Sequence, residues 1–67
     1  MKLHINGESV EVPNSVDSVT ELLTHFQLQD KVVIVELNKH ILEKENHALT
    51  TVTDGDRIEI VHFVGGG

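Results

Sequence analysis

The residues with the clearest chemical potential are three consecutive glycines, Gly65, Gly66 and Gly67, which end the chain after a strand-like run from Ile58 to Val64. Glycine has no Cβ, so such a tail can enter a narrow cleft and leaves its terminal carboxylate sterically open. Four extended residues would reach about 13 to 14 Å beyond the fold. The alternative is a frayed end or an expression remnant without function. The tail alone leaves both interpretations open.

Other reactive groups are scarce. The chain contains no cysteine, which excludes disulfides, CxxC redox motifs, thiolate zinc sites and a cysteine nucleophile. Its five histidines show neither HxH nor i, i+4 spacing, so we expect surface histidines and no metal site. They are His4, His25, His40, His47 and His62. Only His62 lies close to the tail in sequence, and we predict that it tunes the docking of a partner.

Composition indicates one small folded domain. A chain of 67 residues buries only about 60% of its unfolded surface, so it cannot support two cores, and we expect no large pocket. Hydrophobic residues make up 39% and charged residues 24%, which is typical of globular proteins. The net charge of −6 disfavours nucleic acid and favours a basic partner. No signal peptide or membrane segment is evident, so we expect a soluble, cytoplasmic protein.

The N-terminal third predicts a hairpin followed by a helix. Apolar and polar residues alternate on both sides of Asn6-Gly7, a pair that tolerates the positive φ angles of a type I′ turn. Ser18 and Glu21 have the spacing of a capping box, which predicts a helix starting there. An apolar stripe at helical spacing follows, made of Val19, Leu22, Leu23 and Phe26.

The remaining residues predict three more strands. Residues 31–37 contain a β-branched run that suits a central strand, and Asn38-Lys39 turns the chain into a short strand at 41–42. A polar loop over 43–53, anchored by Leu49 and Val52, leads to the last strand. One helix across one face of a mixed four- or five-stranded sheet is the economical arrangement, which is an α+β fold.

Strand parity predicts an apolar patch on the open face of this sheet. Side chains alternate between faces, so Val32 and Ile34 share a face with Glu36, and Val61 and Phe63 share a face with Glu59. If the two strands are neighbours, Ile34, Val61 and Phe63 form an apolar patch beside the root of the tail. The alternative is that the 43–53 loop or a second copy of the chain covers these residues.

The whole chain resembles the ThiS family of thiamine-biosynthesis sulfur carriers, which has the ubiquitin-like β-grasp fold. The resemblance depends on the Asn6-Gly7 hairpin, on the segments 18–23 and 35–38, and most specifically on residues 54–67. It implies a β-grasp domain over residues 1–64 and a flexible tail over 65–67. The chain departs from the family at 38–44, where Lys39 stands in place of the usual glycine, and we expect it to strain that turn.

The resemblance implies a protein substrate that is not itself an enzyme. A ThiF-type adenylating enzyme would use ATP and Mg²⁺ to adenylate the Gly67 carboxylate, which as an anion is a poor electrophile. Sulfur from a donor protein would then give a thiocarboxylate, a 1-thioglycine, at Gly67, for delivery to a ThiG-type thiazole synthase. Gly65 and Gly66, which have no side chains, would let a partner enzyme reach the Gly67 carboxylate. The absence of cysteine fits a carrier that holds sulfur only at its end.

Two other functions remain open from the sequence. A small subunit of molybdopterin synthase shares the fold, the Gly-Gly end and the activation chemistry, but its members are usually longer and end differently. A ubiquitin-like modifier or interaction domain would instead form an isopeptide bond through Gly67, or use no chemistry there.

Overall fold

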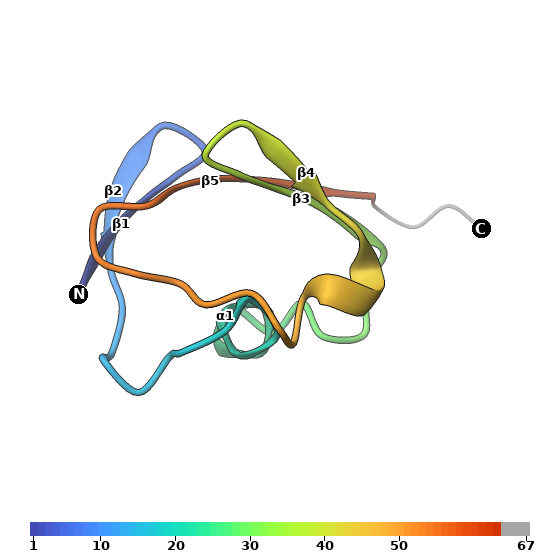
Figure 1. The fold of residues 1–67 in the computed structure, drawn as a ribbon, viewed down its shortest axis with the longest axis horizontal. Helices are drawn as coiled ribbons and strands as arrows, with labels where there is room; N and C mark the ends of the chain where they lie inside the picture. Colours follow the sequence, from blue (N-terminus) through green and yellow to red (C-terminus); the bar gives the residue numbers. More distant parts are fainter. Residues whose placement is uncertain (64–67) are drawn as a thin grey trace.

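The structure is a computed structural model that describes residues 1–63, and it contains a curved five-stranded sheet with one helix packed across one face (Figure 1). The strand order is β2-β1-β5-β3-β4, with β1 and β5 parallel and the other neighbours antiparallel. This mixed sheet confirms the predicted α+β, β-grasp arrangement. The elements are β1 (Lys2–Ile5), β2 (Glu8–Glu11), α1 (Val19–His25), β3 (Val33–Leu37), β4 (His40–Leu42), a 3₁₀ turn η1 (Lys44–Asn46) and β5 (Arg57–His62).

The β1–β2 hairpin forms as predicted around Asn6 and Gly7, whose φ angles are 51° and 83°. The structure adds a role for the Asn6 side chain. Its Oδ1 accepts a hydrogen bond of 2.8 Å from the Ile60 amide, and its Nδ2 donates one of 3.1 Å to the Ile60 carbonyl. Because β1 and β5 pair over only two residues, this side chain extends the contact between the hairpin and β5.

Helix α1 begins at the predicted capping box. The Glu21 amide donates to Ser18 Oγ at 3.2 Å, and the Ser18 amide donates to the Glu21 carboxylate at 3.1 Å. Three stripe residues are buried as predicted, namely Val19, Leu22 and Leu23. The prediction is wrong for Phe26, which is 36% exposed, because the helix ends at His25 and Gln27 turns the chain with a φ of 62°.

The core lies between α1 and the sheet. Its buried side chains are Leu3, Val12, Val16, Val19, Leu22, Leu23, Val35, Val52, Ile58 and Ile60. Val52 anchors the loop over 43–53 as predicted, but Leu49 is 81% exposed and does not. Backbone hydrogen bonds hold this loop instead, since the Val19 amide donates to Thr50 and the Val52 amide donates to Asp17. The part of the chain that the structure describes contains no helix long and apolar enough to span a membrane.

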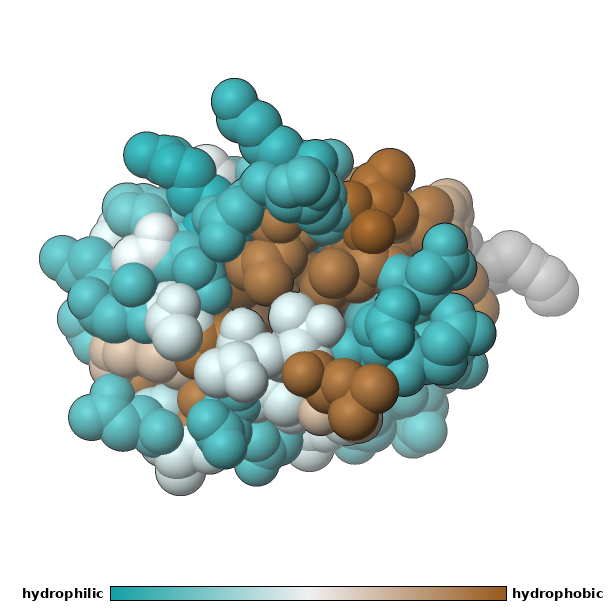
Figure 2. Space-filling model, in the orientation of Figure 1, coloured by the Kyte–Doolittle hydropathy of each residue, from teal (hydrophilic) through white to brown (hydrophobic). Residues whose placement is uncertain are grey.

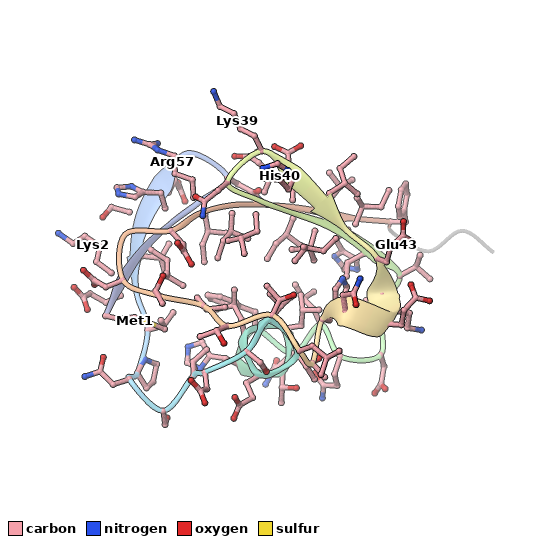
Figure 3. All side chains as sticks on the ribbon, in the orientation of Figure 1. Met1, Lys2, Lys39, His40, Glu43 and Arg57 are labelled. Atoms are coloured by element: carbon pink, nitrogen blue, oxygen red, sulfur yellow. The ribbon has the colours of Figure 1, made fainter. Side chains whose placement is uncertain are left out.

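The β3–β4 turn adopts the backbone expected of Asn-Gly although its second residue is lysine. Asn38 and Lys39 have φ angles of 48° and 75°, both in the left-handed region. Asn38 tolerates this region and hydrogen-bonds to Asp56 and to the Arg57 amide. Lys39 has no such compensation, and its side chain points away from the sheet (Figure 3). The predicted strain at Lys39 is therefore present in this turn.

Candidate partner-docking face

The sheet face opposite α1 carries the predicted apolar residues side by side. Strands β3 and β5 are antiparallel neighbours, and Ile34 lies directly opposite Val61. The Phe63 amide donates to the Val32 carbonyl at 3.1 Å, so the pairing continues to the last described residue. Ile34, Val61 and Phe63 are 44%, 52% and 53% exposed. The condition for the predicted patch, that the two strands are neighbours, is confirmed.

Two further side chains enlarge this surface. Val32 and Ile41 are each 70% exposed, and Ile41 pairs with Glu36, which places it on the face that carries Ile34. The apolar patch therefore consists of Val32, Ile34, Ile41, Val61 and Phe63, and brown apolar surface is visible at the upper right of Figure 2. Strand parity placed Val32 on this face, but the predicted patch did not include it. Ile41 was not predicted, because strand parity does not say which strands pair.

No described segment of the chain covers the apolar patch. The 43–53 loop, which was one candidate cover, pairs instead with the residues just before and at the start of α1, on the opposite side of the sheet (Figure 1). Such a group of exposed apolar side chains on a small protein is typical of a surface for contact with another macromolecule.

A pair of carboxylates borders the apolar patch. Glu36 and Glu59 lie directly opposite each other in the β3–β5 ladder, one pair inward from Ile34 and Val61 on the same face. Neither forms an ion pair within residues 1–63. Arg57 precedes Glu59 by two residues on β5 and Lys39 follows the end of β3, so both cations lie at the turn end of the sheet, beyond the carboxylates. Figure 3 shows these two side chains at that end. Along β3 and β5 the face therefore passes from apolar residues through two carboxylates to a cationic end, and Ile41 lies beside Glu36 on β4.

His62, the fourth predicted docking residue, lies on the other face of the sheet. It pairs with Val33 and lines a groove on the helix side, together with Ile5, Phe26 and Leu28. The structure thus brings Ile34, Val61 and Phe63 together but separates His62 from them. Any effect of His62 on docking would have to come from the groove side.

The histidines do not form a metal site in the described residues, where no group of three or more metal-ligating side chains lies together. The expectation of surface positions is wrong for His47, which is only 7% exposed. Its carbonyl accepts a hydrogen bond from the Thr20 amide in the first turn of α1, which draws the residue inward. Its Nε2 has no hydrogen-bond partner within residues 1–63. No periodicity in the loop could have indicated this burial.

The predicted chemical site at Gly65, Gly66 and Gly67 lies outside the described residues. What the structure contributes is the position of the strand that leads to it. Strand β5 is flanked by β1 and β3, and Phe63 follows it directly at the apolar patch. Val61 and Phe63 of the patch therefore belong to the same segment of chain that leads to the tail.

Comparison with known proteins identifies the family. The sequence model of the ThiS family matches residues 3–67. The chain is 46% identical over 65 residues to the sulfur carrier protein ThiS of Bacillus subtilis, covering 97% of this chain and 98% of that protein. It is also 43% identical over 67 residues to a thiazole synthase of Paramagnetospirillum magneticum, of which it covers only 20%.

A solved structure agrees with the sequence comparison. The crystal structure of the thiamine biosynthesis protein ThiS from Geobacter metallireducens matches with a TM-score of 0.82 and 43% identity, covering all of both chains. The similarity thus extends over the hairpin, the helix and the sheet with its exposed face. This chain belongs to the ThiS family.

Proposed function

We propose that this chain is a sulfur carrier for thiamine biosynthesis whose Gly67 carboxylate holds the sulfur. Family membership supports the carrier function, and the observation that carries the proposal is the end-to-end match to a ThiS sulfur carrier. The family match extends to residue 67, so it includes the three glycines that the proposed adenylation and sulfur transfer need. The chain serves as a protein substrate, and partner enzymes perform the catalysis.

The chemistry follows from the properties of a carboxylate. As an anion it resists nucleophilic attack, so one carboxylate oxygen first attacks the α-phosphate of ATP and Mg²⁺-bound pyrophosphate leaves. In the resulting acyl adenylate the carboxylate charge is gone and AMP is a leaving group, so the carbonyl carbon can be attacked. A persulfide of a donor protein attacks this carbon and AMP departs, and a thiol then cleaves the acyl disulfide to leave the thiocarboxylate. ATP and Mg²⁺ belong to a ThiF-type adenylating enzyme in this scheme.

A thiazole synthase of the ThiG type is the proposed acceptor of the sulfur. The thiazole synthases of Paramagnetospirillum magneticum and Magnetococcus marinus match all of this chain over about a fifth of their length, at 43% and 34% identity. A region similar to the carrier is thus part of the same polypeptide as those enzymes. Covalent linkage of this kind favours direct contact between carrier and synthase as separate chains.

The apolar patch is the proposed surface by which these partners hold the carrier. Val61 and Phe63 of the patch lie at the end of β5, so a partner that covers them holds the chain directly before the tail. Docking by the fold would then place Gly67 in the partner's active site without any specific contact to the glycines themselves. The roles of Ile34, Val61 and Phe63 in the proposal follow from this geometry.

Intact mass spectrometry of the protein purified from its own cells tests the proposal. A mass increase equal to one oxygen-to-sulfur exchange, located at Gly67 by fragmentation, is the expected result. A branched adduct between Gly67 and a lysine would instead identify a modifier. A chain that stays unmodified when incubated with its adenylating enzyme, ATP and a sulfur donor would refute the carrier function.

A further inference from the structure

The carboxylate pair of Glu36 and Glu59 is an arrangement that folding does not favour. Side chains directly opposite in an antiparallel ladder have Cβ atoms about 4.5 to 5.5 Å apart, and like charges at such positions are destabilising. The chain contains cations on the same face, yet no ion pair with either carboxylate forms within residues 1–63. A locally unfavourable feature that the fold retains is expected at a functional surface.

From this geometry we propose that the carboxylate pair receives a cationic side chain, an arginine, from the protein that docks on the apolar patch. The position of the pair supports this occupant. An arginine whose stem lies over Ile34 and Val61 would bring its guanidinium to Glu36 and Glu59, the next pair on the same face of the ladder. A guanidinium has five N–H donors in a planar fork, so it can donate to both carboxylates at once.

Arginine fits this surface better than lysine for a second reason. The pair borders Ile34, Val61 and Ile41 of the patch, so a docked partner would exclude water from the edge of the pair. Guanidinium is more weakly hydrated than ammonium and is enriched in interface cores, where lysine is depleted. The inference rests on the proposed function in one respect, because it takes the docked protein to be a partner of the sulfur carrier.

A second copy of this chain is a poorer occupant. In a dimer with two-fold symmetry centred on the apolar patch, the carboxylates of one copy would lie against the outer edge of the other. Lys39 and Arg57 lie on the far side of the carboxylates from Ile34 and Val61, so a dimer centred on these two residues would not bring the cations to Glu36 and Glu59. The charge order on the face therefore favours a different protein.

The test compares the wild-type chain with the double variant Glu36→Gln/Glu59→Gln. The matched control is Glu8→Gln/Glu45→Gln, which changes the net charge equally at two exposed positions in β2 and η1. Calorimetric titration with the adenylating enzyme of the same organism, at low and moderate salt, gives the Kd. We expect the double variant to bind at least about tenfold more weakly and with a shallower salt dependence, and the control to bind within about twofold of wild type.

Thermal melts show that the effect does not come from unfolding. The double variant should melt at or above the wild-type temperature because like-charge repulsion is removed. Equal affinity of the double variant and the wild type for the enzyme would overturn the inference. So would a wild-type dimer in sedimentation analysis that becomes monomeric in the double variant, since the cation would then belong to a second copy.

A partner-independent measurement separates this inference from the proposed function. In heteronuclear NMR, N-acetyl-arginine amide should shift the backbone amides around Glu36 and Glu59 in the wild type more than the lysine analogue does. The double variant should lose this shift. If these shifts occur while the wild-type chain fails to bind the adenylating enzyme, the inference stands and the proposed function fails. If the enzyme binds and no arginine-specific shift occurs, the arginine assignment is wrong.

Discussion

Replacing Ile41 by alanine should weaken partner docking while leaving the fold nearly intact. Complete burial of an isoleucine side chain is worth about 1.5 to 3 kcal/mol. Ile41 is 70% exposed in the chain by itself, so about 1 to 2 kcal/mol of this is left for docking. That corresponds to an increase in Kd of about 5- to 30-fold. The buried remainder predicts a loss of folding free energy below about 1 kcal/mol.

Leu49→Ala is the matched control for this prediction. Leu49 is 81% exposed, its truncation also removes an aliphatic side chain without changing charge, and its loop pairs with the start of α1 instead of the open sheet face. Calorimetric titration of both variants against the adenylating enzyme should show weaker binding only for Ile41→Ala. If both variants bind like the wild type, or if Leu49→Ala loses as much affinity, the patch as defined from the structure is not the docking surface.

Three other predictions concern the turns and the tail. Lys39→Gly should stabilise the chain by about 1 kcal/mol and raise Tm by about 4 to 8 °C, because it removes the Cβ from a residue with a φ of 75°. Lys39→Ala keeps the Cβ and should give no gain in the same thermal melts. Asn6→Gly should lower the free energy of unfolding in urea by about 1 to 2 kcal/mol, because both hydrogen bonds to Ile60 are lost. Asn6→Ala should lower it by about 1 kcal/mol more than Asn6→Gly does, because alanine is strained at the positive φ of this position. Equal losses in the two variants would show that only the hydrogen bonds matter. Deleting Gly67, or adding one alanine after it, should abolish ATP–pyrophosphate exchange catalysed by the adenylating enzyme without changing Tm, and exchange that survives would refute the role of the tail.

Local sequence signals predicted the parts of this fold that depend on neighbours in the chain. The Asn6-Gly7 turn requires two residues that tolerate positive φ, and the capping box requires Ser18 and Glu21 at fixed spacing. Strand parity needs only an alternation of two, so it placed Ile34 and Val61 on one face before their pairing was known. Each of these predictions involves a constraint that a few adjacent residues satisfy by themselves.

Tertiary contacts decided the features that the sequence could not predict. In the irregular 43–53 loop, hydrophobicity was the only guide, and it predicted Leu49 and Val52 as anchors and a surface position for His47. Val52 is buried, but backbone bonds between this loop and the start of α1 leave His47 buried and Leu49 exposed. Ile41 lies in a strand of three residues, and its face is determined by its pairing with Glu36. The enlarged patch therefore required the sheet order.

The central position of β5 supports the proposal that the apolar patch positions the tail for its chemistry. Pairing with β3 over five residues and with β1 over two fixes the register of β5, so Val61 cannot shift relative to Ile34 without breaking ladder bonds on both sides. A shift of one residue would also expose Ile58 and Ile60 and bury Glu59. The separation between the patch and the proposed sulfur-bearing carbon then depends only on the residues after Phe63. Each residue adds about 3.3 to 3.6 Å when extended, so a partner that holds the patch can accept one tail length and reject its neighbours.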